Sequence, residues 1–74
     1  MKERDKDLVA FGNNLRHIRV GHHLKQGELA DRCGTSREYV SRVENGAQSA
    51  TVAMCFRFAS ALGLHISDLF ADLE

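Results

Sequence analysis

The chain of 74 residues lacks a net charge, because ten Lys and Arg residues balance ten Asp and Glu residues. A protein that coats nucleic acid without regard to sequence needs a basic excess to neutralise phosphates, so this balance argues against that class. No apolar run is long enough to cross a bilayer, and the first seven residues are too charged for a signal peptide. We therefore expect one small cytoplasmic domain with no separate effector-binding module.

Cysteine is scarce, and histidine is not arranged for metal binding. Cys33 and Cys55 fall on apolar stripes, where a free thiol packs as a small hydrophobic group, so core packing is favoured over a disulfide. His22 and His23 lack the spaced Cys and His pairs of structural zinc sites. No motif places a nucleophile beside a base. We expect no metal, no cofactor and no enzymatic activity.

The charges that are present are unevenly distributed. From residue 16 to residue 42 there are six basic residues against three acidic ones. After Glu44 the basic residue Arg57 faces three acidic ones, Asp68, Asp72 and Glu74. The middle of the chain is therefore its positive part.

The stretch over residues 25–46, KQGELADRCGTSREYVSRVENG, predicts two short helices joined by a tight turn. Two apolar stripes at helical spacing carry this prediction: Leu29, Ala30, Cys33, Val40 and Val43. Gly34 separates them and permits the positive φ that a helix end needs. Thr35 or Ser36 can cap the second helix. If Thr35 is the cap, Glu38 stands at the third helical position and can close a capping box.

The second helix, over residues 36–45, carries polar side chains on the face opposite its valines. The groups suited to base edges are Arg37, Glu38, Ser41 and Arg42. Arginine can bind guanine through two hydrogen bonds, and a glutamate can accept from the cytosine amine. A solvated surface helix shows the same polarity, so this pattern alone leaves both interpretations open.

The segment LKQGELADRCGTSREYVSRVENG, followed by ASALGLHISDLF, resembles the helix-turn-helix of the phage repressor, Cro and Xre-type family. The shared features are a Gln that opens the first helix, Leu-Ala, a Gly in the turn, a hydroxyl residue, a Val or Ile, and a closing Glu-Asn-Gly. The resemblance extends from about Phe11 to Phe70. In size the chain also resembles the small controller proteins of restriction-modification systems.

The resemblance implies a transcriptional regulator that binds double-stranded DNA as a homodimer on a palindromic operator, with the helix over 36–45 in the major groove. No small-molecule effector is expected. We assign base contacts to Arg37, Glu38, Ser41 and Arg42. We assign phosphate contacts to Lys25, Gln26, Ser36, Tyr39 and Asn45. The resemblance also implies a partly buried salt bridge between Arg19 and Glu44.

The whole chain predicts an all-α, compact, lambda-repressor-like domain of five helices. We place these helices over about residues 7–20, 26–33, 36–45, 51–62 and 66–72. They form a domain over 7–74 that follows a flexible charged segment over 1–6. In the fourth helix, Val52, Cys55, Ala59 and Leu62 form the predicted inward stripe.

Large apolar side chains off the predicted inward faces indicate a contact between subunits. These residues are Met54, Phe56, Phe70 and Leu73. The loop over residues 47–50 lacks the basic residue and the proline that relatives often carry, which weakens the case for tight contact with the DNA backbone. The alternative function is therefore a helix-turn-helix fold used as a protein interaction module or an antitoxin partner.

Overall fold

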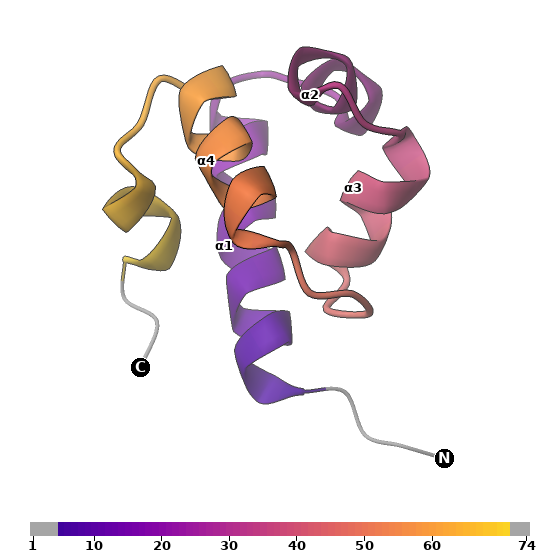
Figure 1. Cartoon of the computed structure of the whole chain (residues 1–74), viewed down its shortest axis with the longest axis vertical. Coiled ribbons are helices and arrows are strands. Elements are labelled where there is room, and N and C mark those ends of the chain that lie inside the picture. Colours follow the sequence, from indigo (N-terminus) through magenta and orange to yellow (C-terminus); the bar gives the residue numbers. More distant parts are fainter. Residues whose placement is uncertain (1–4, 72–74) are drawn as a thin grey trace.

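The computed structural model describes residues 5–71, and in this range the chain is helical throughout its regular structure, with no strand. The elements are α1 (Lys6–Gly21), α2 (Gln26–Cys33), α3 (Arg37–Glu44), α4 (Val52–Ala61) and the 3-10 helix η1 (Ile66–Phe70). Figure 1 shows α1 as the long central helix, with α2 and α3 on one side of it and η1 on the other. The predicted all-α class is confirmed.

Local capping decides where the helices begin. The side chains of Asp5, Ser36 and Thr51 accept hydrogen bonds from backbone N–H groups in the first turns of α1, α3 and α4. Asp5 and Lys6, which we expected in the flexible segment, are thus the cap and the first residue of α1. The helix at 36–45 is capped by Ser36 rather than Thr35, so Glu38 is its second residue and the capping-box alternative is wrong.

The start of α2 has an unusual cap. Lys25 stands at the capping position, where its ammonium group has no acceptor to offer. The carboxylate of Glu28 instead accepts a hydrogen bond of 2.8 Å from the backbone N–H of Lys25. One half of a capping box is therefore present, and the first N–H groups of α2 receive no side-chain acceptor from Lys25.

Left-handed residues turn the chain at the helix ends. Gly34, Gly46 and Gly63 have φ values of +68°, +72° and +67°. Gly21 is the last residue of α1, but the left-handed residue that follows is His23, at φ +58°. The backbone N–H groups of His23 and Leu24 donate to the carbonyls of Val20 and Arg19, the pattern of a Schellman cap. His23 therefore occupies a position that favours glycine.

The prediction of a fifth α-helix over 66–72 was wrong, because the last element is the short 3-10 helix η1. The side-chain amide of Asn14, on α1, donates to the carbonyl of Leu69 at 2.6 Å. The N–H of Ala71 donates to the carbonyl of Asp68, a bond of the tighter 3-10 type. Ala71 itself is extended, so the helix ends at Phe70, and residue 72 lies outside the described residues.

The core lies among α1, α2, α3 and α4 and is completed by η1. Its fully buried large side chains are Leu15, Leu29, Val40, Val43, Phe58 and Leu69. Cys33 and Cys55 are buried free thiols, and burial raises the pKa of each, with Arg57 opposing the shift at Cys33. The inward stripe of α4 is confirmed except at Val52, which is 73% exposed because it opens the helix at the rim of the core.

Two glycines allow the end of α3 to pack closely against α1. A Cβ on Gly12 would overlap the carbonyl oxygens of Val43 and Glu44, so the two helices approach closely only because Gly12 has no side chain. A Cβ on Gly46 would lie 2.6 Å from Cγ2 and 2.8 Å from Cα of Val9. These contacts fix the position of α3 along the axis of α1.

Arg19 and Glu44 form a buried ion pair that joins α1 to α3, with side chains 11% and 1% exposed. Nε and Nη2 of Arg19 donate to Oε2 and Oε1 of Glu44 at 2.7 and 3.0 Å. Nη1 donates to the carbonyl of Leu24 at 2.7 Å. Nε2 of Gln26, at the start of α2, donates to Oε1 of Glu44 at 3.0 Å. The pair therefore also orients the turn before α2 and the first residue of α2.

The left-handed turn at His23 generates a prediction about stability. His23→Gly should stabilise the protein by roughly 0.5–1 kcal/mol. The left-handed conformation costs an L-residue about 1–2 kcal/mol, and glycine removes that cost. Part of the gain is offset because glycine raises the conformational entropy of the unfolded chain. Denaturant unfolding measures the difference. Gly34→Ala is the matched control, since Gly34 has a similar φ and open space around it, and it should lose stability. If His23→Gly lowered the free energy of unfolding, the left-handed conformation assigned to His23 would be contradicted.

The buried ion pair generates a second prediction. Arg19→Ala should destabilise the fold by about 3–5 kcal/mol, because Glu44 would remain buried without its partner, and Glu44→Ala should act similarly. The double variant should lose less than the sum of the two. Arg16→Ala, exposed on α1, is the control and should change stability by less than about 0.5 kcal/mol. Strict additivity in denaturant melts would mean that the two side chains do not interact.

Candidate nucleic-acid interface

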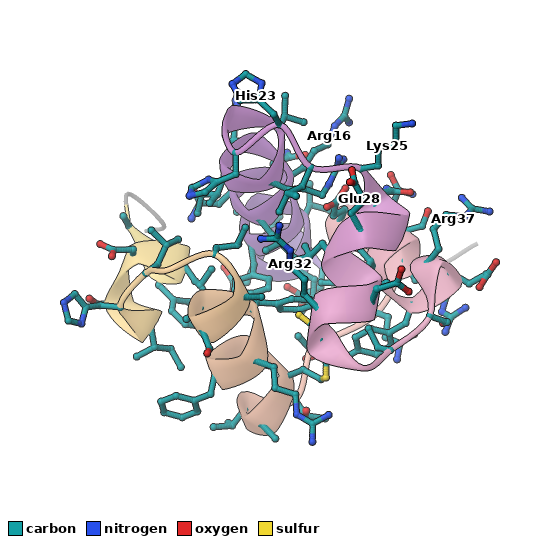
Figure 2. The ribbon with its side chains drawn as sticks, turned by 90° about the horizontal axis from the view of Figure 1, so that it is seen from above. Arg16, His23, Lys25, Glu28, Arg32 and Arg37 are labelled. Atoms are coloured by element: carbon teal, nitrogen blue, oxygen red, sulfur yellow. The ribbon has the colours of Figure 1, made fainter. Side chains whose placement is uncertain are left out.

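The α2-turn-α3 unit presents one polar face to solvent. Within the unit, α2 packs against α3. The unit is held to the rest of the domain by contacts of α2 with α4 and of α3 with α1. Val40 and Val43 are fully buried, so the opposite face of α3 points outward. Figure 2 shows Lys25 at the start of α2 and Arg37 at the start of α3 extending away from the helical body. The unit thus exposes two helix starts that both carry a cation.

The residues assigned to base edges share this outward face of α3. Arg37, Glu38 and Arg42 are exposed, and Ser41 is partly exposed. Nη2 of Arg37 lies 3.7 Å from Oε2 of Glu38, with both side chains more than 60% exposed, so this pair holds neither group strongly. Nε of Arg42 donates to Oε1 of Gln48 at 2.7 Å. The face therefore offers two guanidinium groups, a carboxylate and a hydroxyl.

The residues assigned to phosphates occupy more varied positions. Lys25 is exposed at the start of α2, where backbone N–H groups and the helix dipole favour anions. Gln26 uses one amide hydrogen on Glu44, which leaves the second for another acceptor. The hydroxyl of Ser36 is engaged as the cap of α3. Asn45 donates to the hydroxyl of Ser41 at 3.4 Å.

The phosphate contact assigned to Tyr39 stays a prediction, and this side chain is partly buried in the free protein. Its ring packs against the core, and its hydroxyl is buried with no hydrogen-bond partner in the described part of the chain. A phosphate contact would require this side chain to rotate outward. A buried hydroxyl without a partner costs free energy, so such a rotation would relieve that cost.

Sequence reasoning missed two residues that position this face or its side chains, Gly12 and Gln48. Gly12 gave no periodic signal, because its importance depends on a close approach to α3, which lies far along the chain. Gln48 stands in the uncharged loop over residues 47–50, and its side-chain oxygen accepts a hydrogen bond from Nε of Arg42. A polar side chain just beyond a helix end is a weak signal, and only the folded loop gives it meaning.

Three of the four apolar residues assigned to a subunit contact lie on α4 and η1. Phe56 and Phe70 are 57% and 47% exposed. The ring of Phe70 lies 5.1 Å, between centroids, from that of Phe11. Met54 is partly buried and packs against the core, and Leu73 lies outside the described residues. A groove of about 640 Å³ runs between the first turns of α1 and the start of α4, and its lining is mostly apolar.

Other kinds of site find no support in residues 5–71. No group of three or more His, Cys, Asp or Glu side chains in this range is arranged to hold a metal ion. In the same range, none of the helices has both the length and the apolar character needed to span a membrane.

Comparison with known proteins gives matches over most of the chain. A family model described as helix-turn-helix matches residues 15–69. A helix-turn-helix-type transcriptional regulator of Methanocaldococcus jannaschii is 33% identical over 58 residues, which cover 78% of this chain and 88% of that protein. The control protein C.MunI of a Mycoplasma species is 31% identical over 67 residues, covering 89% of this chain and 90% of the relative.

A solved structure agrees with these sequence matches. The restriction-modification controller protein C.AhdI of Aeromonas hydrophila superposes with a TM-score of 0.88 at 36% identity, over 89% of this chain and all of that one. Residues 15–69, which the family model matches, include α2, the turn and α3. The chain belongs to the helix-turn-helix family of DNA-binding transcriptional regulators, the family of the restriction-modification controller proteins.

Proposed function

We propose that this protein is a cytoplasmic, sequence-specific regulator that binds a palindromic duplex operator as a homodimer, with α3 in the major groove. The observation that carries the proposal is the polar face of α3, exposed on a helix whose opposite face is fully buried. Such a helix can enter a groove without disturbing the core. The controller proteins among its relatives support a regulatory role of this kind.

Base contacts come from the side chains of α3. Arg37 is the first residue of the helix, and in helix-turn-helix proteins the N-terminal residues of this helix meet base edges. Arg42 lies toward the other end, so the two guanidinium groups are separated along the groove. Each can bind the O6 and N7 atoms of a guanine, and a good contact of this kind discriminates by about 1–3 kcal/mol. Glu38 and Ser41 lie between them.

Phosphate contacts come mainly from the start of α2. Its first N–H groups receive no side-chain acceptor from the cap residue, and the exposed Lys25 adds a positive charge there. Gln26 can donate its second amide hydrogen to a phosphate while the first remains on Glu44. Because Glu44 also holds Arg19, such a contact would fix the register of α3 in the groove through the buried ion pair. The neutral net charge means that these few contacts, rather than a general positive field, would hold the DNA.

Dimerisation would use elements other than those that face DNA. Phe56 lies on α4 and Phe70 on η1, and both expose large apolar surface. Burial of these rings against a second copy would remove that surface from water. One recognition helix contacts only a few base pairs, and a two-fold dimer doubles the contacted sequence.

The same exposed rings favour a second candidate function, binding of a different protein with no operator. The uncharged loop over residues 47–50 agrees with that alternative. Sedimentation of the isolated protein at micromolar concentration, together with gel shifts on duplexes selected from a randomised library, separates the two. A wholly monomeric protein that selects no duplex would favour the protein partner.

The third prediction separates base recognition from phosphate binding. Arg37→Ala or Arg42→Ala should weaken binding to a selected duplex by about 1–3 kcal/mol and relax the preference at particular base pairs. Gln26→Ala should weaken all sequences about equally. Binding to the selected duplex and to its single-base variants measures both effects. If both arginine variants keep the affinity and the preference, α3 does not contact the bases and the proposed function fails.

The fourth prediction concerns assembly. Phe56→Glu should give a folded monomer with much weaker operator binding, because a charge would be placed in the apolar contact. Circular dichroism checks the fold, and sedimentation measures the mass. Arg16→Glu is the control: Figure 2 shows Arg16 on the side of α1 away from α4, and this variant should remain dimeric. An unchanged dimer in Phe56→Glu would exclude Phe56 from the subunit contact.

A further inference from the structure

Arg42 is exposed on α3, and its guanidinium group makes a short hydrogen bond to another side chain of the protein. Its Nε donates to Oε1 of Gln48 at 2.7 Å. Gln48 stands in the loop after α3, six residues further along the chain. Arg37, by comparison, has only the exposed contact of 3.7 Å with Glu38. The two arginines on the same face therefore differ in how firmly they are held.

The loop that carries Gln48 is itself held in place. The N–H groups of Gly46 and Ala47 donate to the carbonyls of Val43 and Arg42, which closes α3 with a Schellman cap. Gly46 is buried against Val9 of α1, so the loop leaves α3 at a fixed angle. Gln48 is half-buried at this point. Its amide is thus a fixed acceptor for Arg42 and not a freely moving surface group.

The geometry determines which atoms of Arg42 remain available. A bond to Nε uses the donor nearest the side-chain stem and leaves Nη1 and Nη2 at the far end. Those two groups form the planar fork that matches the O6 and N7 acceptors of guanine. Holding the fork in one orientation before binding reduces the side-chain entropy lost when the contact forms.

We propose that Gln48 is a specificity-determining positioning residue, which orients Arg42 for one base pair of the operator through the bond to Nε. This inference rests on the proposed function, since it requires α3 to contact bases. It predicts a selective effect: loss of the Gln48 acceptor impairs recognition at the base pair contacted by Arg42 and not at the one contacted by Arg37.

The experiment compares base-preference profiles of the full chain. Each variant binds a randomised duplex library, and the bound fraction is sequenced. Gln48→Met removes the acceptor with little change in size, Gln48→Glu keeps an acceptor oxygen, and Arg42→Ala marks the base pair in question. Ser49→Ala is the matched control, because the exposed hydroxyl of Ser49 makes a long bond of 3.5 Å to the adjacent carbonyl of Ala50 and, among residues 5–71, no other.

Gln48→Met should lower the preference at the Arg42 base pair by about three- to tenfold, the size expected for one hydrogen bond, and leave the Arg37 base pair unchanged. Gln48→Glu should retain the preference while weakening all sequences, since it adds a negative charge near phosphates. In the Arg42→Ala background, Gln48→Met should have no further effect on preference. Ser49→Ala should match the wild type.

A second measurement needs no DNA. In the free protein, the Nε–H proton of Arg42 should exchange with water more slowly than that of Arg37 in nuclear magnetic resonance spectra, and Gln48→Met should abolish the difference. Equal exchange in the wild type would overturn the inference, as would a Gln48→Met effect that is absent or equal for all sequences. If Arg37→Ala and Arg42→Ala also leave every preference unchanged, the proposed function has failed as well, and the two failures are thereby distinguished.

Discussion

The placement of α3 depends on the buried ion pair between Arg19 and Glu44. Removing two charges from water is costly, and the cost is offset only when the remaining hydrogen-bonding positions are satisfied. Here Arg19 donates twice to Glu44 and once to the carbonyl of Leu24, and Gln26 adds a further donor to Glu44. One interaction therefore connects α1, the turn before α2, the start of α2 and the end of α3. A shift of any of these parts would leave a buried charge without its partners.

In the proposed complex, stability and recognition would use opposite faces of the same short helix, α3. Val40, Val43 and the carboxylate of Glu44 hold α3 from within, and the absence of a side chain at Gly12 lets it lie close against α1. On the outward face, the long and exposed contact between Arg37 and Glu38 contributes little to the fold. Substitution on that face can therefore change what the helix contacts without changing where the helix lies.

The proposed DNA complex would extend this internal network to the phosphates. Lys25 and Gln26 stand where α2 begins, and Gln26 is already bonded to Glu44. A phosphate held there would be linked through Glu44 to the end of α3. The loop after α3 would act on the side chains in a similar way, since Gln48 orients Arg42. On this view the neutral protein gains specificity from preorganised groups rather than from a large positive charge.

The sequence by itself determined the four α-helices and most of their core faces, because periodicity and capping act within a few residues along the chain. It also predicted the turn at Gly34 and, through the family resemblance, the pairing of Arg19 with Glu44. Only the tertiary structure decided features that join distant segments: the need for glycine at position 12, the exposure of Val52, and the end of η1, where Asn14 bonds a carbonyl 55 residues away. The acceptor for Arg42 also came from a folded loop. Local patterns encode which face of a helix is apolar, but they do not encode the distance between two helices, and contacts such as these depend on that distance.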